Sequence, residues 1–235
     1  MLVDDDVLID AGTGIGDLSL DDLQSIRHVF LTHAHLDHVA GLPMLIDCIF
    51  SENLETPVTV YGRPETIEAL RSHIFNWVIW PDFASLPNTD SPVMRYNTCN
   101  PGETVRIGHR DFHAVEVVHT VPAMGYTVQN SNGAFAVSGD TRSNETLWPV
   151  LNACEDLRAL VIEVSFPNEL RALADTSGHY CPLTLRADLA KLRHTPDIWL
   201  TGMKPGAERR IFDQVSAFLP DRNVRMLERG MIINV

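Results

Sequence analysis

Basic residues are scarce in this sequence, which has 18 lysine and arginine residues against 31 aspartate and glutamate residues. The resulting net charge of −13 disfavours a nucleic-acid polymer or an anionic membrane as a partner, because both are bound through basic surfaces. A small anionic substrate is compatible with this charge, because bound metal ions would dominate the field at their own site.

Long apolar runs are also missing, and no stretch is long enough to span a membrane. The segment Met1–Asp6 has neither the basic nor the apolar region of a signal peptide. The scattered Cys48, Cys99, Cys154 and Cys181 form no C-x-x-C pair, so we expect a reduced, cytoplasmic setting. A periplasmic setting stays open if the natural chain has residues before Met1.

The glycine-rich segment Asp10–Gly16 lacks the G-x-G-x-x-G spacing of a dinucleotide site, so we interpret it as a tight turn after a strand. No repeat, low-complexity run or linker divides the 235 residues. The sequence therefore predicts a single domain, 1–235, that is long enough to bury a sizeable core.

Hydrophobic periodicity and turn residues predict a mixed α/β fold. Expected strands cover residues 2–3, 7–9, 28–32, 58–62, 93–99, 104–107, 112–119, 126–129, 134–138, 160–163, 198–200, 224–227 and 231–235. Expected helices cover residues 20–25, capped by Ser19 and Asp22, then 39–48, a helix opening at Pro64, 144–153, 183–193 and 208–218.

Four polar side chains that can bind metal stand close together after the apolar run Val29–Leu31. They are His33, His35, Asp37 and His38. Gathering such groups is costly unless something binds them, and a metal ion does so. Imidazole nitrogen and carboxylate oxygen suit zinc, and also manganese or iron.

Other polar residues follow predicted strands in the same way as this loop. His33, His119, Asp140, Glu163 and Gly202 each stand at the carboxyl end of a predicted strand. Ligands of layered α/β proteins bind outside the carboxyl ends of the strands, so these distant residues can converge there. That convergence makes His119 and Asp140 candidate metal ligands.

The pattern H-x-H-x-D-H resembles the metal-binding loop of the metallo-β-lactamase fold hydrolases. Within that fold, the sequence is most similar to the class II cyclic-nucleotide phosphodiesterases. The stretches that carry this similarity are residues 33–42, 73–83, 138–141, and 163–168 with 177–179. The resemblance implies a four-layer αββα sandwich. It also implies that a metal-bound hydroxide hydrolyses the 3′-phosphoester bond of 3′,5′-cyclic nucleotides, such as cyclic AMP, to 5′-monophosphates.

The resemblance also implies roles for individual residues, with one or two zinc ions as the cofactor. One ion would be bound by His33, His35 and His119. The other would be bound by Asp37, His38 and Asp140, with Asp140 bridging the ions and Asp37 also serving catalysis. Glu163 and His179 resemble the proton-donating pair of the tRNA 3′-end processing nucleases. His179 would protonate the leaving 3′-oxygen, and Glu163 would orient it.

The sequence departs from the family in two places. Where the family has a T-H-x-K-P-like motif, this chain reads Thr201-Gly202-Met203-Lys204-Pro205, so a ligand histidine is replaced by glycine. We expect weaker binding at the second metal site. The chain also begins at what resembles the second strand of the fold. The sheet edge exposed in this way favours pairing with a second copy, as a homodimer.

Alternatives remain for the function and for one segment. The chain could be a tRNA 3′-end processing nuclease, although the net charge of −13 and the lack of a lysine-rich insertion oppose it. It could also be a degenerate family member that binds a metal or nucleotide with weak or no catalysis, because Gly202 replaces a ligand. The aromatic segment 73–86 is either core packing or the wall of a substrate pocket.

Overall fold

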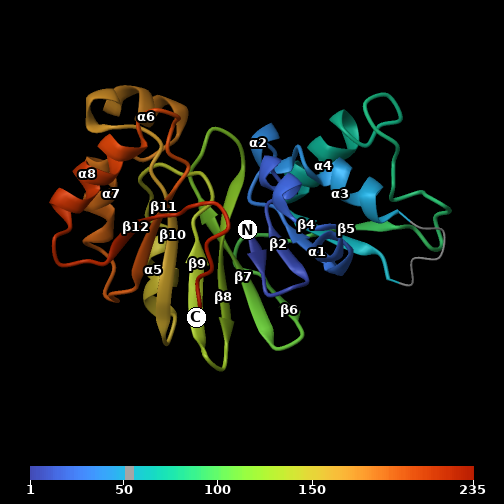
Figure 1. Ribbon diagram of the computed structural model, residues 1–235, viewed down its shortest axis with the longest axis horizontal. Helices are drawn as coiled ribbons and strands as arrows, with labels where there is room; N and C mark the ends of the chain where they lie inside the picture. Colours follow the sequence, from blue (N-terminus) through green and yellow to red (C-terminus); the bar gives the residue numbers. More distant parts are fainter. Residues whose placement is uncertain (51–55) are drawn as a thin grey trace. The chain divides into compact units, whose positions relative to one another are not determined.

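The computed structural model describes residues 1–50 and 56–235, which form two compact units, 1–100 and 101–235 (Figure 1). Each unit contains one β-sheet with helices packed against it, so the predicted mixed α/β class with two sheets is confirmed. The single hydrolase domain over residues 1–235 stays a prediction.

The sheet of the first unit has the strand order β1-β2-β3-β4-β5. Its strands are β1 (Leu2–Val3), β2 (Val7–Ile9), β3 (His28–Phe30), β4 (Val58–Gly62) and β5 (Met94–Thr98). The strands predicted over 2–3 and 7–9 are confirmed, and they pair antiparallel as β1 and β2, while β2 to β5 run parallel. The carboxyl ends of β2 and β3 therefore lie at the same edge of this sheet.

The helices of the first unit connect these parallel strands. They are the 3-10 helix η1 (Thr13–Asp17), α1 (Leu20–Ser25), α2 (Leu36–Val39), α3 (Leu42–Ile49) and α4 (Pro64–His73). The predicted capping box of α1 is present. The helix predicted over 39–48 is present as α3 but begins three residues later than predicted, because Gly41 separates α2 from α3. Its backbone N–H donates to the Ala11 carbonyl at 2.8 Å instead of continuing one helix.

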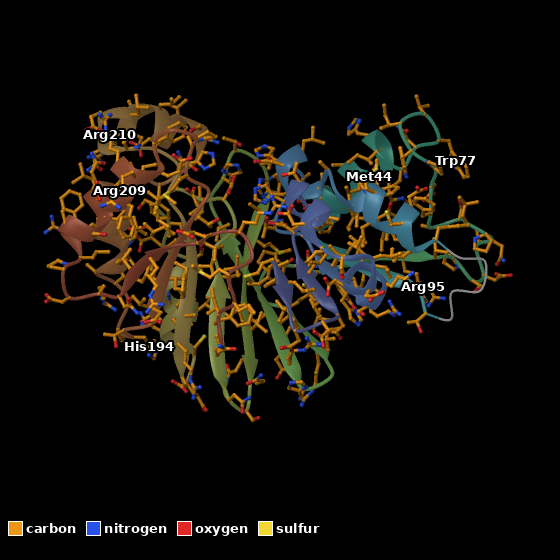
Figure 2. All side chains as sticks on the ribbon, viewed as in Figure 1. Met44, Trp77, Arg95, His194, Arg209 and Arg210 are labelled. Carbon is orange, nitrogen blue, oxygen red and sulfur yellow. The ribbon has the colours of Figure 1, made fainter. Side chains whose placement is uncertain are left out.

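The core of the first unit forms where α1, α3 and α4 cover one face of the sheet. Leu8, Val29 and Val60 of the strands pack there with apolar residues of the helices. The aromatic segment 73–86 divides: Phe75 joins this core at 2% exposure, while Trp77 is 63% exposed on the loop after α4 (Figure 2). Core packing is thus confirmed for Phe75, and the pocket-wall interpretation stays a prediction.

The sheet of the second unit has the order β12-β11-β10-β9-β8-β7-β6. Its strands are β6 (Thr104–Ile107), β7 (Arg110–Val117), β8 (Ala123–Asn130), β9 (Gly133–Val137), β10 (Leu157–Glu163), β11 (Asp197–Thr201) and β12 (Val224–Met226). Strands β6 to β9 form an antiparallel meander, and β9 to β12 are parallel. It follows that β7, β9, β10 and β11 all end at one edge.

The helices of the second unit are α5 (Leu147–Ala153), the 3-10 helix η2 (Asn168–Leu170), α6 (Arg171–Ser177), α7 (Pro182–Leu189) and α8 (Glu208–Phe218). Residues of α5, α7 and α8, such as Trp148, Leu185 and Ile211, pack on one face of the sheet. Helix α5 begins three residues later than predicted, because the Asn144 side chain accepts the Leu147 N–H at 3.0 Å. No pattern in the sequence predicted α6.

The strand predicted over 231–235 is wrong. This segment forms no strand, and its apolar residues Ile233 and Val235 instead pack beside Trp199 on the sheet face opposite the helices, close to β9 in Figure 1. Its alternation of apolar residues thus reflects packing on a sheet rather than pairing within one. None of the helices in the described part of the chain has the length and apolar content needed to cross a membrane.

Candidate functional site

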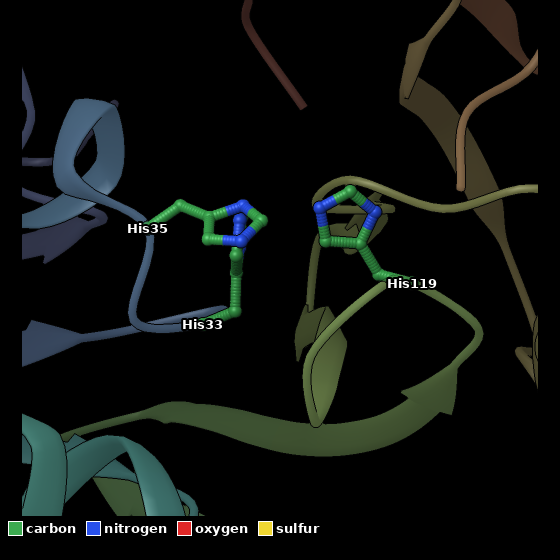
Figure 3. A group of neighbouring side chains, drawn as sticks. All are labelled: His33, His35 and His119. Atoms are coloured by element: carbon green, nitrogen blue, oxygen red, sulfur yellow. The ribbon is translucent and has the colours of Figure 1, made fainter. Parts of the chain in front are cut away.

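The first set of donors lies on the loop that follows β3 and in α2, the short helix that this loop enters. The ring of His33 is 4.7 Å from that of His35, edge to face (Figure 3), and 4.2 Å from that of His38, measured between centroids. Asp37 lies in the first turn of α2, with its carboxylate 3.9 Å from His38 Nε2 and its side chain 73% exposed. The loop therefore gathers three imidazoles, and its carboxylate is open to solvent.

Asp10 orients this loop and was missed in the sequence. His38 Nδ1–H donates to Asp10 Oδ2 at 2.7 Å, and the Thr32 N–H and hydroxyl each donate to the same carboxylate at 2.8 Å. The bond to Asp10 fixes the tautomer of His38 and leaves its Nε2 lone pair for a ligand. Asp10 directly follows β2, the parallel neighbour of β3, so the strand-end rule could have found it.

The second set of donors lies in the second unit, on the loops after β7 and β9. His119 follows β7 (Figure 3), and its Nδ1–H donates to the Gly178 carbonyl at 2.9 Å, leaving Nε2 as the donor atom. Asp140 Oδ2 lies 4.0 Å from that Nε2 and 4.0 Å from His179 Nδ1. Donor atoms of His119, Asp140 and His179 all lie within 4.8 Å of one another. The structure therefore brings these three sequence-predicted residues together.

The backbone conformation at residue 178 explains why the stretch 177–179 has a glycine at its centre. Gly178 ends α6 with φ +75°, a left-handed conformation that favours glycine. A Cβ at this position would lie 2.9 Å from His119 Nδ1, which is closer than side-chain carbons approach. Only glycine therefore lets the chain place its carbonyl against His119 and continue directly into His179.

Glu163 connects the loops of the second set. It is 1% exposed at the end of β10, and its Oε1 accepts hydrogen bonds from His179 Nδ1–H at 2.9 Å, from the Thr141 N–H at 3.1 Å and from the Tyr180 N–H at 3.2 Å. Thr141 directly follows Asp140. One carboxylate thus orients the His179 ring and anchors the backbone beside Asp140.

Burial and hydrogen bonding shift the protonation of this pair. Burial raises the pKa of Glu163, and the hydrogen bond from His179 only partly opposes that change. Burial alone would lower the pKa of His179, but the hydrogen bond and charge of Glu163, aided by Asp140, outweigh it and raise the pKa. The positive charge of Lys204 acts in the opposite direction. The arrangement favours a protonated His179, as a general acid requires.

Gly202 lies directly after β11, where the resemblance placed a histidine. Its carbonyl oxygen is 3.0 Å from Ser165 Oγ, and that hydroxyl also lies 3.1 Å from Glu163 Oε2 and 3.1 Å from His179 Nδ1. Ser165 is a buried positioning residue that the sequence did not indicate, because serine after a strand is also a common turn residue.

Asp188 on α7 is a second positioning residue found only in the structure. It accepts hydrogen bonds from Tyr180 Oη at 2.6 Å, Ser143 Oγ at 2.9 Å, the Asn144 N–H at 3.1 Å and Lys191 Nζ at 2.8 Å. Burial opposes its ionisation, but these bonds outweigh burial and lower the pKa of Asp188. The carboxylate thereby holds the loop after Asp140 and the loop of His179 in place.

The donors of each unit fit a divalent metal ion. Imidazole nitrogen and carboxylate oxygen are the donor types that zinc, manganese and iron accept. His38 and His119 each use Nδ1–H to bind an oxygen atom, which is the arrangement common among metal-bound histidines. His179 differs, because its Nδ1 is bound by a buried carboxylate.

Comparison with known proteins agrees with this chemistry. A probable 3′,5′-cyclic-nucleotide phosphodiesterase of Yersinia pestis is 31% identical over 186 residues, which cover 72% of this chain and 52% of that protein. The chain spans about half the length of the curated relatives it matches.

Solved structures show the same fold. Unliganded yeast PDE1 has a TM-score of 0.76 at 21% identity, covering 88% of this chain and 67% of that chain. The metallo-β-lactamase fold protein YhfI of Bacillus subtilis also has a TM-score of 0.76, at 15% identity, covering 98% and 87%. The predicted metallo-β-lactamase fold is therefore confirmed. The sequence model of the beta-lactamase superfamily domain family matches residues 6–195, which are most of the chain, and the chain belongs to that family.

Proposed function

We propose that this chain hydrolyses the 3′-phosphoester bond of 3′,5′-cyclic nucleotides, cyclic AMP among them, to give 5′-monophosphates. The similarity to the Yersinia pestis protein named as a probable 3′,5′-cyclic-nucleotide phosphodiesterase carries the proposal. The hydrogen bond between His179 and Glu163 supports it, because phosphoester cleavage needs a proton donor for the leaving oxygen.

The proposal assigns metal binding to the predicted donors. His33, His35 and His119 are assigned to one zinc ion, and Asp37, His38 and Asp140 to another. Manganese and iron are the other ions that suit these donors. When bound, such ions lower the pKa of a coordinated water and polarise phosphate oxygens. Asp37 serves catalysis through this binding.

The residues of the second unit supply the proton. Water adds across the P–O3′ bond: its oxygen bonds to phosphorus, the P–O3′ bond breaks, and O3′ receives a proton. His179 Nδ1–H is held by Glu163 at 2.9 Å, so the opposite nitrogen, Nε2, is the atom that delivers this proton. Glu163 orients the ring and favours its charged form.

The test measures metal content and cyclic AMP hydrolysis on one chelator-free preparation, with the product identified by phosphorus NMR. We expect about two metal ions per chain and release of 5′-AMP. A single ion or none, with no turnover in excess zinc or manganese, would contradict the proposal and favour the degenerate binder. Cleavage of a precursor tRNA without cyclic AMP turnover would favour the nuclease.

A variant test addresses the proton donor. His179→Asn should lower kcat by about a hundredfold to ten-thousandfold with little change in metal content. The matched control is His113→Asn, since His113 is bound to Thr104 on the neighbouring strand at 2.9 Å. An unchanged kcat in His179→Asn would remove His179 from the chemistry.

The remaining expectations belong to the same proposal. None of the cysteines in the part of the chain that the structure describes forms a disulfide, which supports a reducing, cytoplasmic compartment. Strand β1 is at the edge of the first sheet, which supports pairing with a second copy as a homodimer. Light scattering on the purified chain tests this pairing.

A further inference from the structure

The chain contains only two lysines, and they have different surroundings. Lys191 is ion-paired with Asp188 at 2.8 Å and with Glu145 at 2.7 Å. Lys204, on the loop between β11 and α8, is exposed and has no carboxylate within ion-pair distance in residues 1–50 and 56–235. In a chain of net charge −13, such an ammonium group is available to a ligand.

Backbone bonds hold the loop of Lys204 beside the proton donor. The Lys204 N–H donates to the Ser165 carbonyl at 3.1 Å, and the Gly202 carbonyl oxygen lies 3.0 Å from Ser165 Oγ. The same hydroxyl is 3.1 Å from His179 Nδ1. Met203 packs against the hydrophobic core between these two attachments. The loop is therefore fixed at three consecutive residues, and Ser165, which binds two of them, also contacts His179.

Phe166 links the Lys204 side chain to the imidazole. Lys204 Nζ lies 5.7 Å from the centroid of the Phe166 ring, within the range of a cation–π contact. The Phe166 ring is in turn 5.8 Å from the His179 ring. The aromatic ring is thus the common neighbour of the ammonium and the imidazole, and it restrains a side chain that would otherwise move freely in solvent.

We propose that Lys204 binds a non-bridging oxygen of the phosphate group whose leaving oxygen is protonated by His179. This inference rests on the proposed function. A lysine ammonium is a compact charge that binds phosphate well, and here it carries no competing carboxylate. Fixed near the proton donor, it would orient the phosphate and offset the repulsion from the acidic chain.

Chemical labelling tests the contact without requiring turnover. The metal-loaded chain, residues 1–235, is reductively methylated with and without 5′-AMP, and the rates at both lysines are read by peptide mass spectrometry. We expect 5′-AMP and inorganic phosphate to slow modification of Lys204 several-fold, while adenosine does not. Lys191 is the internal control and should react equally under all conditions. Equal rates at Lys204 with and without 5′-AMP would overturn the inference.

Kinetics separate this inference from the proposed function. Lys204→Gln should raise KM for cyclic AMP by about tenfold, and Lys204→Arg should recover most of the loss. The charge-matched control is Arg209→Gln on α8 (Figure 2), an exposed residue paired with Asp213 at 3.0 Å. Hydrolysis with an unchanged KM in Lys204→Gln would overturn the role of Lys204 and leave the function standing. Protection of Lys204 by 5′-AMP without any hydrolysis would contradict the proposed function and leave phosphate binding by Lys204 standing.

Discussion

Replacing Gly202 by histidine restores the side chain that the phosphodiesterase resemblance places at this position. The structure predicts two opposing effects. Gly202 has φ +70°, and an L-residue in this conformation costs about 1–2 kcal/mol. A Cβ there would lie 3.3 Å from Glu163 Cβ, a tight contact that requires a small shift. The new imidazole should raise metal affinity, because the second site would regain a ligand.

A matched variant separates the two effects. Gly202→Ala has the same backbone strain and the same Cβ contact, but no ligand. In urea unfolding of the metal-free protein, both variants should lose about 1–2 kcal/mol relative to the parent chain. Zinc should then stabilise Gly202→His more than Gly202→Ala, by about 1.4 kcal/mol for each tenfold gain in affinity. Activity of Gly202→His should rise with its metal content.

Two results would refute the reasoning. If metal-free Gly202→Ala is as stable as the parent chain, the left-handed backbone is not strained by a side chain. If zinc stabilises both variants equally, the added imidazole is not a ligand. In that case another group already completes the second site, and the departure at Gly202 does not explain any weakness of metal binding.

Three further predictions concern the positioning residues. Asp188→Ala should lower the free energy of unfolding by about 3–5 kcal/mol, because it leaves both the buried Tyr180 hydroxyl and the buried Asn144 N–H without an acceptor. Lys191→Met, which removes the ion pairs of a partly exposed side chain with Asp188 and Glu145, should lower it by less than about 1 kcal/mol, and equal losses in denaturant titrations would contradict this. The pKa of Asp188 is lower in the folded chain than its ordinary value of 3.8. The ionised carboxylate therefore stabilises the folded chain above pH 3.8, and this stabilisation is lost as the pH falls through the folded pKa. Acid should thus lower the free energy of unfolding of the parent chain more than that of Asp188→Asn. Asp10→Asn should weaken zinc binding by about tenfold to a hundredfold in a chelator competition assay, whereas the exposed Asp17→Asn should not.

Most of the fold could be predicted from local patterns. Parallel strands buried on both faces read as short apolar runs, so β4 was found with its observed bounds, and β3, β10 and β11 were found with shifted ends. The capping box of Ser19 and Asp22 fixes the start of α1, whose predicted bounds agree with the observed ones. The errors occurred where contacts distant in sequence decide the structure. The segment 231–235 packs on a sheet instead of joining one, and Gly41 separates α2 from α3 by bonding to Ala11.

The sequence by itself indicated the candidate donor residues, because side chains that can bind metal crowd one loop and recur at strand ends, where neighbouring strands of a sheet bring them to the same edge. The tertiary structure decided how those side chains are held. Asp10, Ser165 and Asp188 act through hydrogen bonds to His38, His179 and Ser143, which lie 28, 14 and 45 positions away in the sequence. Such partners leave no period or motif in the sequence. A buried carboxylate becomes a positioning group only when folding surrounds it with donors, so its role appears only in the folded chain.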